Sequence, residues 1–250
     1  MREEEYGYRG FQGEVPWPYG GSKMMSQGLA IAIKDIKTEF RTKEMVFSML
    51  VFSLFVMVAF YFAFYFYSLS SEALEPLVSP ILWVTFFFAG MFGLLTSFSK
   101  EKDRGSLEGL MLCPMDRSAI YFGKVLSNYF LILLVDIFAL IFFVLFFSYD
   151  FNGNLLPVLV VVFLGTFCFV VSGTLISGIA VNAQDIRGVL IPILLIPIIL
   201  LTVLMPSVNA TSKALEGDII DAIPELRILG VFAVIYIAIA YLLFDFVLEE

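Results

Sequence analysis

Residues 99–124 read SKEKDRGSLEGLMLCPMDRSAIYFGK and form the only dense run of charge between two long apolar segments. Because the segments on either side are long enough to cross a bilayer, this loop is where the membrane part of the chain meets water. Gly105 and Ser106 offer a helix start, and Glu108 falls in the first turn, where the helix dipole favours a negative charge. We therefore expect a short helix at the membrane surface.

That short helix has one apolar side. Leu107, Leu110 and Met111 stand at positions i, i+3 and i+4, and Pro114 ends the helix. Charged residues precede this helix in the loop. Such a helix can fit a groove in a partner protein and act as a lever that the membrane spans anchor. The alternative is a loop that is charged only so that it stays in the cytoplasm, and the pattern alone leaves both interpretations open.

The composition is typical of a protein that crosses the membrane several times. Hydrophobic residues make up 60% of the 250 residues and charged residues only 15%, whereas soluble domains are about 45–50% apolar. The chain has no His, and Cys113 and Cys168 lack the spacing of a metal site. No basic stripe suggests nucleic acid as a partner. We expect a protein of the lipid bilayer without catalytic residues, directly bound cofactor or metal.

Six apolar stretches account for most of the chain. Each has about 18 to 28 residues, which at about 1.5 Å per residue is enough to cross a hydrocarbon layer of about 30 Å. Lipid offers no partner to an open backbone, so helices are the expected structure. We therefore predict an all-α integral membrane protein with six transmembrane helices. The stretches are residues 45–67, 78–98, 120–147, 155–181, 188–205 and 226–248.

The positive charges are distributed unequally between the two sides of these spans. Of the 15 Lys and Arg residues, only Lys213 and Arg227 fall on one side. The others lie before the first span, in and beside the loop 99–119, and at Arg187. Since positively charged loops stay in the cytoplasm, we expect a multi-pass protein of the inner (cytoplasmic) cell membrane with both termini inside. The outer loops are then 68–77, 148–154 and 206–225.

The first 25 residues differ in composition from the rest of the chain. They are rich in Gly, Tyr, Pro and Glu and show neither helical nor strand periodicity, which predicts a disordered cytoplasmic tail. An alternative is that translation starts at Met24 or Met25 and that the extension is not native. We therefore divide the chain into a tail, residues 1–25, and a membrane domain, residues 26–250.

A helical pattern begins just before the first span. Leu29, Ile33, Ile36 and Phe40 fall on one face of a helix, and charged residues occupy the other face. This pattern predicts an N-terminal amphipathic helix that lies in the headgroup region of the membrane. A solvated extension of the first span is the alternative.

Four residues within the spans are candidates for a translocation path. Asp136 lies near the middle of its span, where a charge costs about 2.5–3.5 kcal/mol, so it is either hydrogen-bonded inside the bundle or lines a polar path. Ser177 belongs to a run of small residues that favours close helix packing, with a substrate slot as the alternative. Pro192 and Pro197 should bend the fifth span, either as a static kink or as part of a gate.

The charged loop resembles the signature of ABC-2 type permeases. The resemblance is carried by the loop and its flank, in which the matching residues are Glu101, Arg104, Gly105, Ser106, Leu107, Glu108, Leu110, Met111, Pro114, Gly123 and Lys124. Within that superfamily the chain looks most like the CcmB family, the permease of the haem-export ABC transporter in cytochrome c maturation. The features that point there are the compact length, the segment RGVLIP at 187–192 and the closing segment FDFVLEE at 244–250.

This resemblance implies how the chain would work. In the superfamily the segment after the second span couples the membrane subunit to its ATPase. The sequence lacks the phosphate loop G-x-x-x-x-G-K-[ST], so ATP would bind to a separate partner subunit. Six spans are half of a twelve-span pathway, which implies a homodimer or a heterodimer with a similar chain. Haem is a possible substrate, and cytochrome c maturation proteins are possible partners.

Two alternative functions remain at this point. One is an ABC-2 exporter of another substrate, such as a drug, a lipid or a polysaccharide. The other is an ion-driven secondary transporter, which would need titratable groups near the midplane and would often contain internal repeats. Asp136 is nearly alone as such a group, and no repeat is visible.

Overall fold

The computed structural model describes residues 20–66, 71–103, 117–151, 153–182, 197, 199–216 and 219–247. This part of the chain is helical and contains no β-strand, which confirms the all-α fold class. The helices are α1 Gly20–Thr42, α2 Glu44–Phe66, α3 Ser71–Asp103, α5 Arg117–Phe147, α6 Leu155–Asn182, the π-helix η1 Leu200–Leu204, α8 Met205–Glu216, the 3-10 helix η2 Ile219–Ala222 and α9 Ile223–Val247.

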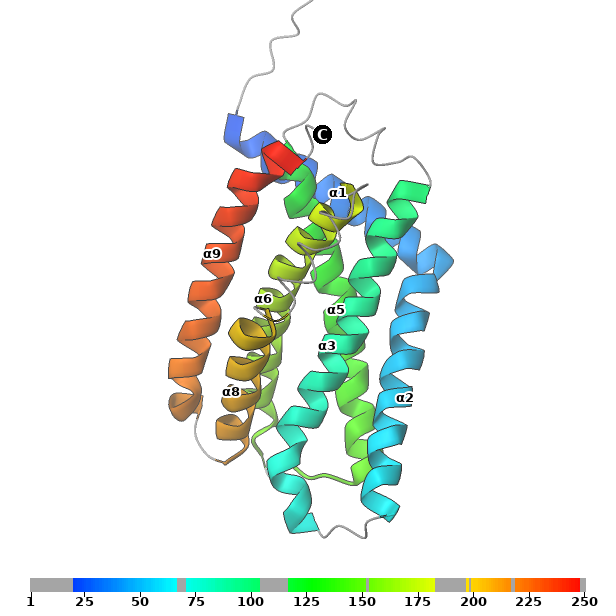
Figure 1. Ribbon diagram of the computed structural model, residues 1–250, viewed down its shortest axis with the longest axis vertical. Helices are drawn as coiled ribbons and strands as arrows, with labels where there is room; N and C mark the ends of the chain where they lie inside the picture. Colours follow the sequence, from blue (N-terminus) through cyan, green and yellow to red (C-terminus); the bar gives the residue numbers. More distant parts are fainter. Residues whose placement is uncertain are drawn as a thin grey trace, which may run out of the picture.

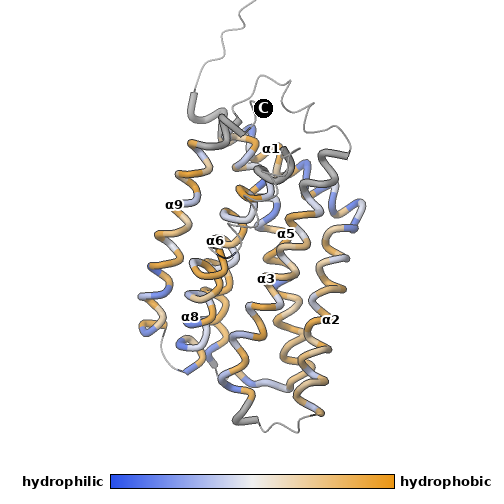
Figure 2. The backbone as a smooth tube through the Cα atoms, in the orientation of Figure 1, coloured by the Kyte–Doolittle hydropathy of each residue, from blue (hydrophilic) through white to orange (hydrophobic). Residues whose placement is uncertain are grey.

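Within the described residues, five helices are long and apolar enough to cross a membrane. They are residues 44–66, 74–97, 118–147, 155–177 and 219–242, and each has 23 to 30 residues. Figure 1 shows them running along the long axis of the molecule as one bundle. In Figure 2 hydrophobic residues predominate along their length, and hydrophilic residues gather near their ends.

The sixth predicted span is not among these five helices. Most of the stretch 188–205 lies outside the described residues, and its described end forms the π-helix η1, which continues directly into α8. Thus the structure supports five of the six predicted spans.

The prediction of a loop at 206–225 is wrong for most of its length, because α8, η2 and the start of α9 fall within this stretch. Residues of this stretch form α8, a helix with one buried side that includes Ser207, Ala210, Thr211 and Ala214. The stretch looked like a loop because its hydropathy is low. Its small and hydroxyl side chains nevertheless allow a helix to pack closely against its neighbours, which hydropathy does not detect.

The other two outer loops have different outcomes. The loop predicted at 68–77 is mostly helical, because α3 already begins at Ser71. Glu72, Glu75 and Pro76 lower the hydropathy of that turn, so the apolar pattern starts later than the helix does. The chain does leave helical structure between α5 and α6, as predicted, and passes through positive φ angles at Ser148 and Gly153.

The N-terminal helix also starts earlier than the sequence suggested. Residues 20–25, assigned to the tail, belong to α1, while residues 1–19 lie outside the described part of the chain. α1 is not a straight extension of the first span, because Lys43 has φ 58° and separates α1 from α2. Figure 1 shows α1 crossing obliquely over one end of the bundle.

The buried side chains form two clusters along the bundle. The cluster nearer α1 contains Met45, Met49, Ile120, Tyr121, Val125, Leu175 and Tyr236 among others. The other cluster contains Met57, Leu82, Trp83, Phe143, Val158 and Ala214 among others. Between helices in lipid the hydrophobic effect contributes little, so tight packing and a few polar contacts hold such clusters together.

Candidate functional site

Most residues of the predicted coupling loop lie outside the described part of the chain. The structure places its two ends: α3 ends at Asp103 and α5 begins at Arg117. Both ends lie at the end of the bundle that α1 crosses (Figure 1). Glu101 is in the last turn of α3. The loop residues outside the described part are Arg104, Gly105, Ser106, Leu107, Glu108, Leu110, Met111 and Pro114.

Lys124 is the one loop-associated candidate whose side chain is described, and it is buried. Its Nζ lies 2.8 Å from Asp35 Oδ2 on α1, and the side chains of Lys124 and Asp35 are only 4% and 15% exposed. Lys34 also approaches Asp35, at 3.1 Å, from the outside. A buried ammonium group is costly without a partner, so Asp35 fixes α1 against α5. The sequence singles out Lys124 but does not identify Asp35 as its partner.

Two glycines bring the backbones of α1 and α5 into contact. A Cβ atom at Gly123 would lie 2.8 Å from the carbonyl oxygen of Gly28 and 2.8 Å from the Cβ of Ile31. A Cβ atom at Gly28 would lie 3.2 Å from the carbonyl oxygen of Ala119. The crossing therefore requires glycine on α5 and is tight on α1. It lies within the first two turns of α5, directly after the coupling loop.

Glu39 joins the other end of α1 to the first span. Its Oε1 accepts hydrogen bonds from the backbone N–H groups of Met45 (2.6 Å) and Val46 (3.1 Å), and the residue is buried. These N–H groups belong to the first turn of α2, where helix donors have no partner within the helix. A carboxylate at this position is also favoured by the α2 dipole. α1 is thus tied at one end to α2 and along its middle to α5.

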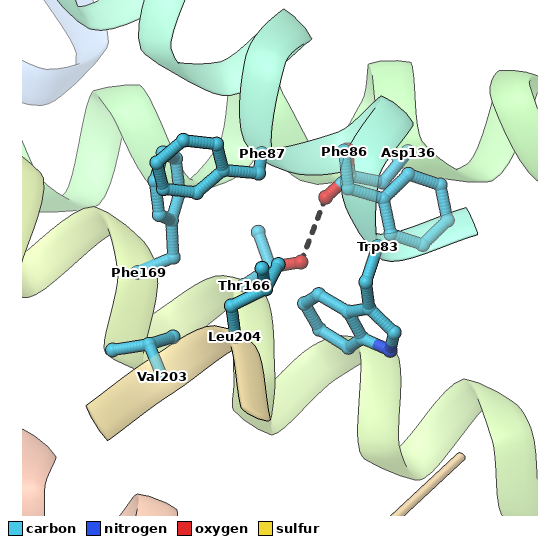
Figure 3. Close-up of a pocket in the computed structure, with 8 residues that line it drawn as sticks. All are labelled: Trp83, Phe86, Phe87, Asp136, Thr166, Phe169, Val203 and Leu204. Atoms are coloured by element: carbon cyan, nitrogen blue, oxygen red, sulfur yellow. Dashed lines mark hydrogen bonds between the residues drawn. The ribbon is translucent and has the colours of Figure 1, made fainter. Parts of the chain in front are cut away.

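A second polar site lies inside the bundle, between α5 and α6. Asp136 is 1% exposed, and its Oδ2 accepts a hydrogen bond of 2.7 Å from Thr166 Oγ1 (Figure 3). Its Oδ1 has no hydrogen-bond partner among the described residues. The Asp136 side chain is therefore hydrogen-bonded within the bundle. Sequence reasoning did not identify Thr166 as its partner.

The Asp136 carboxyl faces a small cavity. The cavity has room for about one water molecule. Its other walls are almost entirely apolar, as Figure 3 shows. The lining residues besides Asp136 are Trp83, Phe86, Phe87, Thr166, Phe169, Val203 and Leu204.

Trp83 lines this cavity and is fixed by two contacts, one with Thr211 and one with Gly165. Its Nε1 donates a hydrogen bond of 2.7 Å to Thr211 Oγ1 of α8, so both polar atoms are satisfied in the interior. A Cβ atom at Gly165 would lie 2.2 Å from Trp83 Cη2, which means that the indole occupies the space above this glycine. The unexpected helix α8 therefore holds Trp83, one of the side chains that line the cavity at Asp136, without lining that cavity itself.

The path candidates Ser177 and Pro197 are not among the residues that line the cavity at Asp136. Ser177 is buried on α6, but it follows Thr166 by eleven residues, or about 16 Å along the helix. Pro192 lies outside the described residues, and Pro197 is exposed. Among the candidates whose position is described, only Asp136 lines this cavity.

A larger groove lies beneath the first half of α1. It has a volume of about 570 Å³ and is bounded by α1, α5, α6 and α9. Its walls include Leu29, Phe122 and Ile237, together with the rings of Tyr121 and Tyr129. The two hydroxyl groups bond to the backbone carbonyls of Val171 and Phe163. The groove is therefore almost purely apolar and opens between the helices of the bundle.

A comparison with protein families connects this architecture to a function. The family model described as CcmB protein matches residues 26–248, which is most of the chain. No curated protein matches the sequence closely enough to count as a relative. Proteins of the CcmB family are multi-pass membrane permeases and not enzymes, and in general they work with an ABC ATPase and other cytochrome c maturation components. The chain belongs to the CcmB family and is the permease subunit of an ABC-type haem exporter.

Proposed function

We propose that a separate ATPase subunit drives this permease through the loop 99–119 and helix α1. The observation that supports this mechanism is the double attachment of α1, to α5 through the Lys124–Asp35 ion pair and to α2 through Glu39. A displacement at the start of α5 is then passed to α1, and from α1 to the start of α2. Because charge pairs and backbone contacts are stiff, α1 moves with both helices as one body.

The loop itself provides the handle on which the ATPase acts. Glu101, Arg104 and Glu108 are proposed to contact the partner by charge, while the apolar side of the short helix fits a groove on it. Pro114 ends that helix and separates it from α5. The proposal rests on the sequence pattern of this loop and on the position of its two ends, which lie at the end of the bundle that α1 crosses (Figure 1). ATP binds to the partner, since the chain lacks a phosphate loop.

The same proposal includes a topology and an assembly. Both termini and the loop 99–119 lie in the cytoplasm, and the stretch 188–205 completes six spans in the inner membrane. α1 lies in the headgroup region, as an amphipathic helix before a first span does. Two copies, or one copy and a similar chain, form the pathway. The distribution of Lys and Arg supports this orientation.

Asp136 is proposed to line the path of the substrate. Its carboxyl group lines a cavity whose aromatic walls come from α3 and α6, helices that α1 does not hold directly. When the bundle rearranges, this cavity can widen and expose a polar group to a flat, largely apolar ligand such as haem. The chain has no imidazole to bind the haem iron. Aromatic stacking and the carboxyl group are what it offers instead.

Co-purification of the permease with its ATPase tests the coupling mechanism. Deletion of residues 105–111, or Glu108→Lys, should abolish the association while the permease remains folded in the membrane. Glu216→Lys is the matched control, because Glu216 is exposed at the end of α8, away from α1. Undiminished co-purification of the deletion variant would refute the role of the loop as the handle.

A further inference from the structure

Helix α1 has three distinct faces. The first, which includes Gly28 and Asp35, packs on α5. The second carries large apolar side chains that remain about half exposed: Leu29, Ile33 and Phe40 are 51%, 46% and 52% exposed. The third is basic. We call Lys34, Lys37 and Arg41 the basic strip, since helical spacing places all three on one side of α1.

The acidic residues of α1 neutralise this strip only in part, because Lys34 approaches Asp35 at 3.1 Å while Lys37 and Arg41 have no such partner within the described residues. Asp35 forms an ion pair with Lys124 of α5, and Glu39 accepts hydrogen bonds from backbone N–H groups of α2. Both carboxylates therefore lie on the inner face. Lys37 and Arg41 form no ion pair within the described residues. The outward surface of α1 is thus positive, although the chain as a whole has a net charge of −8.

The apolar face shows at what depth the basic strip lies. The ring of Phe40 is 6.5 Å from that of Phe130, which is 45% exposed on α5 within a membrane span. Phe40 therefore lies beside a surface that faces hydrocarbon, and Arg41 follows it directly in the sequence. An arginine at this level reaches the headgroup layer with its guanidinium while its stem stays in contact with apolar groups.

We propose that the basic strip of α1 binds the headgroups of anionic phospholipids. The exposed apolar face favours lipid over an acidic protein surface as the occupant, because acyl chains can cover Leu29, Ile33 and Phe40 while the headgroups meet the basic strip, whereas an acidic surface offers these side chains no apolar contact. Each basic residue near an anionic surface adds about fivefold to lipid binding. Since α1 is fixed to α2 and α5, the lipid composition then influences how stably α1 is held. The inference does not depend on the coupling loop and requires only that α1 lies at a membrane surface.

The relative affinity of the full chain for spin-labelled phosphatidylglycerol and phosphatidylcholine tests this proposal. The protein is reconstituted without the ATPase, and the immobilised fraction of each labelled lipid is measured by electron paramagnetic resonance. The native chain should prefer phosphatidylglycerol, and the preference should weaken as salt is added. The double variant Lys37→Gln with Arg41→Gln should lose most of it, by about tenfold or more.

Two control variants keep the outcome interpretable. The charge-preserving pair Lys37→Arg with Arg41→Lys should retain the lipid preference, and so should Arg227→Gln, which removes a cation at the opposite end of the bundle. Circular dichroism of each variant shows that the helices are intact. An unchanged preference in the double variant would overturn the proposal. Loss of ATPase binding with an unchanged lipid preference would also overturn it, and would assign the strip to the partner protein.

Discussion

Lys124 and Asp35 form an almost buried ion pair that joins the first turns of α5 to the middle of α1, with 2.8 Å between Nζ and Oδ2. Lys124 directly follows Gly123, the residue at which the backbones of the two helices touch. A charge pair and a backbone contact at the same crossing leave α1 little freedom to slide. This crossing is the structural reason for treating α1 as part of the moving body and not as a passive leader to the first span.

Substitution of Lys124 should destabilise the protein far more than substitution of Lys34, although both contact Asp35. Lys124→Met leaves Asp35 without its inner partner, and removal of one member of a buried pair costs about 3–5 kcal/mol. Lys34 is about half exposed, so Lys34→Met should cost about 0–1 kcal/mol. Unfolding in mixed micelles measures both. The double variant Lys124→Met with Asp35→Leu should recover part of the loss, and strict additivity would contradict the pairing.

Gly123→Ala should loosen α1 from α5. The new Cβ would meet the carbonyl oxygen of Gly28 at 2.8 Å, a distance at which backbone must shift. Gly230→Ala is the matched control, because no atom lies within 4 Å of a Cβ at that position of α9. The control should stabilise its helix by up to about 1 kcal/mol. Limited proteolysis near α1 should accelerate in the first variant only; equal protection in both would argue against the contact.

Thr211→Val should destabilise the protein through Trp83. The change keeps the shape of the side chain but removes the oxygen that accepts the 2.7 Å hydrogen bond from the indole N–H. A buried donor left without a partner costs about 1–3 kcal/mol. Thr211→Ser keeps the hydroxyl group and should lose less. Thermal unfolding followed by tryptophan fluorescence compares the two, and an equal loss would show that the methyl group and not the hydrogen bond matters.

Asp136→Asn should lower haem export while leaving assembly intact. The amide has nearly the same shape and still accepts a hydrogen bond from Thr166, so packing is preserved. Only the ability to carry a negative charge is lost. Export is measured as cytochrome c maturation in cells, and assembly as co-purification with the ATPase. Full export by Asp136→Asn would leave the residue with a packing role alone.

Thr166→Val is the companion variant for that experiment. It removes the hydrogen bond to Asp136 Oδ2 but leaves the carboxyl group in place. If the carboxyl group serves transport and Thr166 only orients it, export should fall less in this variant than in Asp136→Asn. The reverse order would indicate that the hydroxyl group itself meets the substrate.

Hydropathy determined the fold class and most of the spans. Stretches such as 120–147 and 155–181 coincide with α5 and α6 to within a few residues, because in lipid a long apolar segment has no alternative to a helix. The loop pattern around Arg104 and Glu108 resembled ABC-2 permeases, and the compact length with the segments RGVLIP and FDFVLEE pointed to the CcmB family, which the family comparison confirms.

Helix α8 and the turn that begins α3 could not be found in this way. The α8 sequence is polar enough to be a loop, and only its contact with Trp83 across 128 positions of chain makes Thr211 an interior residue. The same holds for Thr166, which has nothing in its sequence neighbourhood to mark it as the partner of Asp136. Contacts between residues far apart in the chain leave no local pattern.

The amino-acid order by itself determined that the chain is a helical membrane protein, because the cost of unpaired backbone in lipid is a property of single segments. Only the tertiary structure decided which charges are used inside the protein and which remain outside. In the sequence Asp35 and Glu39 look like surface charges of α1. In the structure Asp35 pairs with Lys124, and Glu39 accepts hydrogen bonds from the first turn of α2. Because both carboxylates are used on the inner face of α1, the charge left on its outward face is basic.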